Sequence, residues 1–152
     1  MDIKTYLKTL KLLHLSLVAG LSIFMVVAII QGDGFNTDLS TNSTFLYIVP
    51  VASLIGYFGS QVLFKKMLSS ISQSDLFNQK LQRFQSALLV KYALIEAPAF
   101  LSLFAYYATG NALPLVIAGC LLAYLFVQGP TKEKLKSSLP LNAEEKRTLD
   151  FK

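Results

Sequence analysis

The sequence predicts an all-α membrane protein with four transmembrane helices in an antiparallel bundle. Three observations predict this fold: few charged residues, four long apolar segments, and cations confined to alternate connections. Only 15% of the 152 residues are charged and the mean hydropathy is +0.51, whereas a soluble domain carries roughly a quarter charged residues. A surface with so few water-tolerant groups suits lipid better than water.

The four apolar segments have the length and composition of membrane helices. A bilayer core about 30 Å thick needs roughly 20 mainly apolar residues per helix. The stretch 32–44 is rich in Gly, Asn, Asp, Ser and Thr, which predicts a loop. The fourth segment is short and ends before Gly129 and Pro130, because a proline ring interrupts the hydrogen-bond ladder of a helix. The predicted spans are residues 12–30, 45–64, 86–108 and 112–127.

The N-terminal residues 3–11 alternate apolar side chains with Lys4, Lys8 and Lys11 at helical spacing. We expect this segment to lie along the inner headgroups before it turns into the first span. A cleaved signal peptide is the rival interpretation, but the apolar run that follows is longer than such a peptide needs.

The direction of the spans follows from the Lys and Arg residues, which are enriched in short cytoplasmic loops. Residues 1–11, 65–83 and 131–152 hold three, four and six of them, respectively, whereas residues 32–44 and 109–111 hold none. This pattern places the N- and C-termini in the cytoplasm. Because the net charge of +5 is segregated by loops, it does not predict a basic face for nucleic acid.

Two domains are predicted from this layout. Residues 1–130 form the transmembrane domain, and residues 131–152 form a basic cytoplasmic tail. Asn142 and Glu145 have the spacing of a capping box, which predicts a short helix in the tail, and we expect this helix to be solvated.

Small residues at helical spacing predict where helices pack, because lipid removes the hydrophobic drive and favours close backbone approach. Ala52, Gly56 and Ser60 share one face of the second span, and Ser16 with Gly20 forms a similar pair in the first. These stripes are expected to pack within one chain or to form an oligomer interface.

Glu96 is the residue with the strongest claim to a chemical role. It lies about 15 Å from the inner end of the third span, near the middle of the bilayer core. A charge there costs several kcal/mol or more, so the residue must pair, face the bundle interior or stay neutral. Pro98 leaves the carbonyl of Leu94 without its usual donor and is expected to kink the helix, as is Pro50 in the second span.

Four other polar residues could serve an ion or proton path to Glu96. Lys91 is about 140° round the helix from Glu96 and is expected to snorkel to the inner headgroups. His14 and Gln61 lie at a similar inner depth, and His14 is a possible proton relay because its ordinary pKa is near neutrality. Tyr57 lies between this layer and the depth of Glu96.

The residues required for common enzymatic chemistry are missing from the sequence. One His and one Cys, Cys120, do not supply a catalytic triad, a disulfide framework or a His/Cys metal cage. The sequence also has no phosphate-binding glycine loop. We therefore expect neither an enzyme nor a bound cofactor or metal.

The hairpin 45–108 resembles the proteolipid (c or K) subunit of rotary ATPases, through a mid-membrane carboxylate in the context Ala93-Leu94-Ile95-Glu96-Ala97. The resemblance implies that Glu96 carries an ion. The first helix has fewer glycines than that family, and the loop 69–83 lacks the family's Arg-(Gln/Asn)-Pro motif. Over its full length the chain resembles small four-span bacterial membrane proteins, a likeness that implies no activity.

Two functions remain open at this point. The first is a small accessory or structural membrane subunit in which Glu96 is a buried polar tether. The second is a proton- or ion-coupled transport element in which Glu96 titrates. A lipid-binding role or a membrane-embedded enzyme ranks third. Membrane lipid and either further copies of the chain or a larger membrane complex are the expected partners.

Overall fold

The computed structural model describes residues 3–32, 34–38 and 44–150. The prediction of an all-α fold is confirmed for these residues. The helices, in chain order, are α1 (Ile3–Gln31), α2 (Phe45–Ser69), α3 (Phe77–Thr109), α4 (Ala112–Val127), α5 (Lys132–Ser138) and α6 (Ala143–Asp150).

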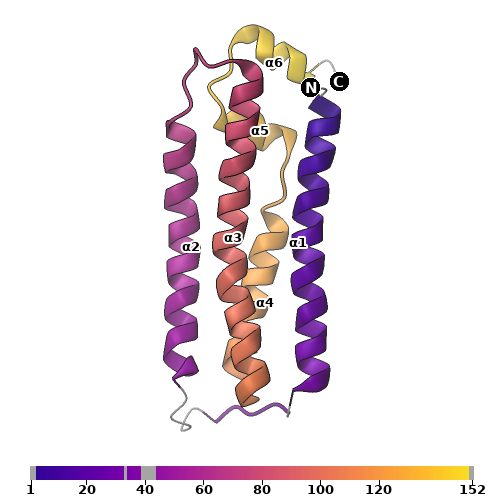
Figure 1. The fold of residues 1–152 in the computed structure, drawn as a ribbon, viewed down its shortest axis with the longest axis vertical. Helices are drawn as coiled ribbons and strands as arrows, with labels where there is room; N and C mark the ends of the chain where they lie inside the picture. The colour runs from indigo at the N-terminus through magenta and orange to yellow at the C-terminus, as the bar shows by residue number, and fades with distance from the viewer. Residues whose placement is uncertain (1–2, 33, 39–43, 151–152) are drawn as a thin grey trace.

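The four long helices lie side by side, and α3 contacts α1, α2 and α4 (Figure 1). Successive helices run in opposite directions, so both described ends of the chain lie at the same end of the molecule, where α5 and α6 also lie (Figure 1). Helices α1, α2 and α3 are long and apolar enough to cross a membrane. Helix α4 makes a fourth candidate only when it is taken together with α5, to which it is bent by 83°.

The predicted boundaries are met most closely in α4, which begins and ends at the predicted residues. The predicted spans 12–30, 45–64 and 86–108 lie inside the longer helices α1, α2 and α3. Neither proline ends its helix: α2 continues through Pro50 and α3 through Pro98. Residues 33 and 39–43 of the predicted first loop lie outside the described residues.

The prediction that residues 3–11 form a separate segment that turns into the first span is wrong, because α1 is continuous from Ile3 to Gln31. Ile3, Tyr6 and Leu10 are buried, and the hydroxyl of Tyr6 donates to the carbonyl of Leu81 over 2.6 Å. Burial of these side chains keeps the segment packed on the bundle.

Helices α2 and α3 pack closely at Gly56. A Cβ atom added there would lie 2.5 Å from the carbonyl oxygen of Leu94 and 2.7 Å from Cγ of Pro98. The carbonyl that Pro98 deprives of a helical donor is thus covered by the backbone of α2. Ser60 on the same stripe is fully buried and Ala52 is partly buried.

The second predicted stripe does not pack within the chain. Ser16 and Gly20 are exposed, and a Cβ added to Gly20 would meet nothing within 4 Å. Their expected use inside the monomer is therefore corrected, because the buried face of α1 is formed by larger side chains such as His14, Val18 and Leu21. The alternative use of this stripe in an oligomer stays a prediction.

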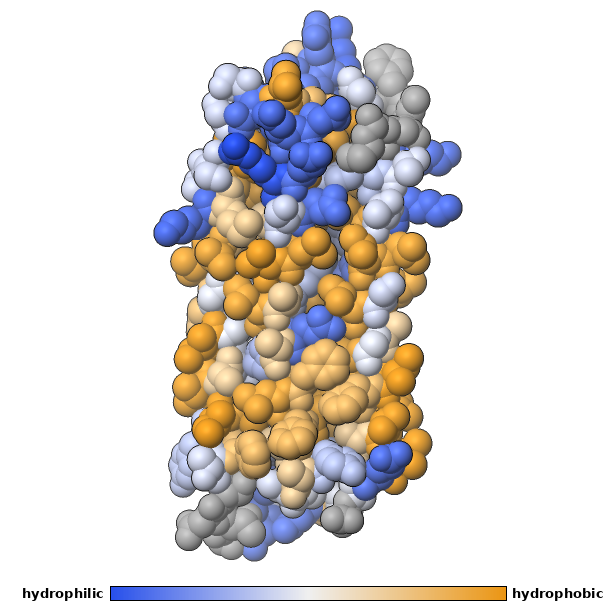
Figure 2. Space-filling model, in the orientation of Figure 1, coloured by the Kyte–Doolittle hydropathy of each residue, from blue (hydrophilic) through white to orange (hydrophobic). Residues whose placement is uncertain are grey.

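The sides of the bundle are covered by exposed apolar residues, which form a broad band between two hydrophilic ends (Figure 2). We call this band the apolar belt. Each of α1, α2 and α4 contributes large side chains that are more than half exposed; examples are Leu12, Ile23, Val51, Ile55, Phe58, Val62, Val116 and Phe126.

The C-terminal segment is folded onto the end of the bundle. The ammonium of Lys80, whose side chain is fully buried, lies 2.9 Å from the carboxylate of Glu145 and donates to the carbonyl of Pro140 over 3.0 Å. Asn142 and Glu145 exchange the reciprocal hydrogen bonds of a capping box at the start of α6. Leu149 of α6 is fully buried.

Candidate functional site

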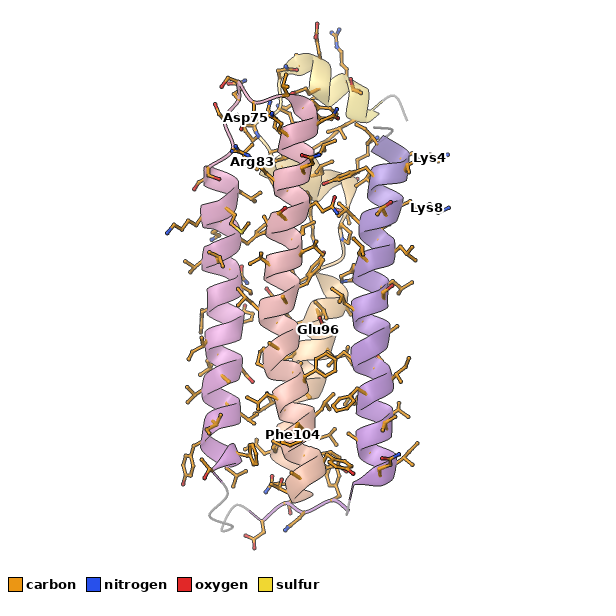
Figure 3. All side chains as sticks on the ribbon, in the orientation of Figure 1. Lys4, Lys8, Asp75, Arg83, Glu96 and Phe104 are labelled. Atoms are coloured by element: carbon orange, nitrogen blue, oxygen red, sulfur yellow. The ribbon has the colours of Figure 1, made fainter. Side chains whose placement is uncertain are left out.

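Glu96 lies near the middle of α3, on the side that faces α1 (Figure 3). Figure 2, drawn in the same orientation, shows a hydrophilic area inside the apolar belt at this place. The side chain is partly exposed. Its carboxyl group makes no hydrogen bond or ion pair with any residue in the described part of the chain.

Two ring contacts fix the position of Glu96 relative to α1. Tyr92, Glu96 and Phe100 are four residues apart and share one face of α3. The ring centroids of Tyr92 and His14 are 5.0 Å apart, and those of Phe100 and Phe24 are 5.3 Å apart. Glu96 thus lies between two contacts that join α3 to α1.

Gly20 of α1 leaves open space at about the level of Glu96. The two ring contacts place α1 residues 18–20 level with Glu96. Gly20 lies one turn before Phe24 on the same flank of α1 and provides no side chain, so space beside it stays open. The Glu96 side chain is itself partly exposed, so it is accessible from the side of the bundle (Figure 2).

A second polar cluster surrounds the C-terminal end of α4. The last carbonyls of a helix lack intrahelical donors. The carbonyl of Leu125 lies 2.7 Å from Nε2 of His14, which must carry the proton because a carbonyl oxygen only accepts. The hydroxyl of Tyr92 donates to the carbonyl of Gln128 over 3.0 Å. Side chains of α1 and α3 together cap α4.

Two lysines complete this cap. The ammonium of Lys91 donates to Oε1 of Gln128 over 2.8 Å and lies 4.8 Å from the centroid of the Phe64 ring. The ammonium of Lys134 donates to the carbonyls of Val127 and Gly129. The expectation that Lys91 snorkels is wrong, because its side chain is buried and finds its acceptor inside the bundle.

Gln61 and Tyr57 lie in a third polar contact, between α2 and α4. The amide of Gln61 donates to the hydroxyl of Tyr124 over 2.7 Å, and the rings of Tyr57 and Tyr124 are 4.9 Å apart. An apolar groove of about 440 Å³ begins here, and Pro50, Ser53 and Cys120 line its other parts.

The predicted ion or proton candidates therefore do not form one site. Lys91 and His14 bond to the end of α4, Gln61 bonds to Tyr124, and Glu96 stands without a partner among the described residues. No group of three or more His, Cys, Asp or Glu side chains able to hold a metal ion is found within the described ranges.

Sequence reasoning missed Gln128, Lys134, Tyr92 and Tyr124. One signal could have pointed to the first three: a helix that stops at Gly129 and Pro130 must satisfy its last carbonyls from elsewhere. Which side chains supply the donors depends on contacts between distant segments, and the sequence alone does not give these.

Comparisons with models of protein families, with curated proteins and with solved structures found no match for this chain.

Proposed function

We propose that the chain is a multi-pass protein of the cell membrane that crosses the bilayer four times, with both termini in the cytoplasm. The apolar belt supports this proposal, because exposed apolar area of this extent suits hydrocarbon. The alternating direction of α1 to α4 and the Lys-rich connections at one end support the orientation (Figure 1).

Helix α4 is shorter than the bilayer core is thick. Its 16 residues rise about 24 Å, which is less than a bilayer core of about 30 Å. Its last carbonyls would then lie in hydrocarbon, where backbone groups must be satisfied by the protein itself. His14, Tyr92 and Lys134 donate to the carbonyls of Leu125, Gln128 and Val127, respectively, which supports α4 as a fourth span that ends below the headgroups.

Within this membrane protein we assign Glu96 the role of a polar tether, and we assign the chain the role of an accessory subunit. One observation carries the assignment: the Glu96 carboxyl is partly exposed in the middle of the apolar belt and has no partner among the described residues. A carboxyl group at that depth is stable when another polar group meets it. The partner is a polar side chain of a neighbouring membrane helix, from a second copy or from a larger complex.

The test compares Glu96→Gln with Glu96→Leu in complexes extracted from native membranes with a mild detergent. Glutamine keeps a hydrogen-bonding side chain of the same length, so the complex should persist. Leucine removes the polar group and should weaken association by about 10-fold, the effect expected for one hydrogen bond between membrane helices. Light scattering on the eluted protein gives the mass of the complex.

Glu133→Leu is the matched control, because Glu133 is an exposed acid on α5 and lies outside the apolar belt. It should leave the mass unchanged. A Glu96→Leu protein that keeps the wild-type complex mass would contradict the tether.

A proton- or ion-coupled transport element is the second candidate, and the access to Glu96 from the side of the bundle favours it. Since His14, Lys91 and Gln61 bond to α4, Glu96 alone would titrate in this role. A hydrophobic carbodiimide should then modify Glu96 in a pH-dependent way, with protection by the transported ion. Glu96→Gln separates the candidates, since it preserves a tether and abolishes transport.

A further inference from the structure

Three lysines line one flank of the first turns of α1. Lys4, Lys8 and Lys11 are spaced by four and three residues and so share that flank. Figure 3 shows Lys4 and Lys8 extending away from the bundle. All three are exposed. None of them makes a hydrogen bond or ion pair with another residue of the described segments.

These lysines border a pocket of about 360 Å³, which we call the lysine pocket. Lys132 at the start of α5 adds a fourth ammonium group to its lining. Ile3, Leu7 and Leu149 supply the apolar part of the lining, and no acidic side chain is among the described residues that line it. The pocket therefore combines four positive charges with an apolar floor.

The lysine pocket is held in place by the fold of the C-terminal segment. Leu149 reaches the pocket because α6 lies on the bundle end, fixed by the ion pair of Lys80 with Glu145 and by the capping box of Asn142. The lining thus comes from three helices that are far apart in sequence.

Lys4, Lys8 and Lys11 have no acceptor among the described residues, whereas three other lysines of the molecule do. Lys80 bonds to a carboxylate, Lys91 to an amide oxygen and Lys134 to two carbonyls. Four ammonium groups around one pocket repel one another, and an anion bound among them relieves the repulsion. A phosphate group provides several charged oxygen acceptors for ammonium donors.

The height of the lysine pocket indicates the source of that anion. Lys11 directly precedes Leu12, which is 63% exposed and begins the apolar belt on α1. The pocket therefore lies at the boundary between the belt and the hydrophilic end of the molecule, at the depth of lipid headgroups in the proposed membrane position.

We propose that the lysine pocket binds the phosphate headgroup of an anionic phospholipid from the cytoplasmic leaflet, with the acyl chains along α1 below Lys11. This site rests on the proposed membrane position of the chain. Anionic lipids are attracted by clustered lysines at the cytoplasmic surface, and the apolar floor receives the part of the lipid next to the headgroup.

The test uses the full chain in nanodiscs of phosphatidylcholine with a minor fraction of phosphatidylglycerol. After transfer to detergent, native mass spectrometry counts the phosphatidylglycerol that the protein retains. The wild type should retain it in preference to phosphatidylcholine. The double variant Lys8→Gln and Lys11→Gln should bind it about 30-fold more weakly, the effect of two lysines at a lipid surface.

Lys65→Gln with Lys66→Gln is the matched control. It removes two exposed lysines from the same end of the molecule, on α2 and outside the lysine pocket. This control should retain phosphatidylglycerol as the wild type does. Equal loss in both double variants would overturn the site, because diffuse charge would then explain binding. Undiminished retention in the Lys8 and Lys11 variant, or equally tight binding of inorganic phosphate, would overturn it as well.

Flotation with phosphatidylcholine vesicles separates failure of this site from failure of the proposed function. A wild-type chain that does not float contradicts the membrane position itself. A chain that floats but shows no preference for phosphatidylglycerol contradicts the lysine pocket alone.

Discussion

Some polar side chains inside the apolar segments form hydrogen bonds within the bundle, and one does not. His14, Lys91 and Tyr92 bond to the end of α4, whereas Glu96 is partly exposed and has no partner among the described residues. The sequence shows that each of these residues lies within a span. The sequence does not show which of them find hydrogen-bond partners, because the partners are far apart in the chain. Tyr92 and its acceptor Gln128 are separated by 36 residues, and His14 and Leu125 by 111.

A change of one hydroxyl group tests the cap of α4. Tyr92→Phe should lower the free energy of unfolding by about 1–3 kcal/mol, because the carbonyl of Gln128 loses its buried donor. Tyr107→Phe is the control: Tyr107 lies on the same helix, is exposed, and has a hydroxyl without a partner among the described residues. Unfolding by SDS in mixed micelles measures both, and equal stability of the two variants would speak against the cap.

Helix positions were predictable to different degrees. The bounds of α4 follow from strong local signals, an apolar run between a Gly-Asn turn and a Gly-Pro pair. The start of α1 did not follow from local signals, since its basic and apolar alternation suits a headgroup layer as well as a bundle. Tertiary contacts of Ile3, Tyr6 and Leu10 decide between them. Small-residue stripes behave in the same way: Gly56 packs against α3, whereas Gly20 stays open.

The contact between α2 and α3 is tested by adding one methyl group at two glycines of the same helix. Gly56→Ala should destabilise the fold by about 1–3 kcal/mol relative to Gly59→Ala, because the new Cβ would meet backbone 2.5 Å away. At Gly59 an added Cβ meets nothing within 4 Å. Both changes gain similar helix propensity, so the difference between the two isolates packing. SDS unfolding of both variants that gave equal values would disprove the close approach.

The arrangement of the whole molecule was predicted in part. An apolar composition and alternate basic connections predict long helices that reverse direction, and Figure 1 shows such an arrangement. The expectation of a solvated tail helix is wrong, because the tail packs on the bundle end and buries Leu135, Leu139, Leu141 and Leu149. The buried pair of Lys80 with Glu145 joins segments 65 residues apart. Such a pairing leaves no local pattern in the sequence.

The most direct test of the account concerns which connections share a side of the membrane. Single cysteines at Thr37, Gln73 and Ser137, all exposed, are introduced after Cys120→Ser removes the native thiol. An impermeant maleimide applied to intact cells should label Thr37→Cys. It should label Gln73→Cys and Ser137→Cys only after permeabilisation. Labelling of Thr37→Cys and Ser137→Cys from the same side would contradict a four-span protein with both ends in the cytoplasm.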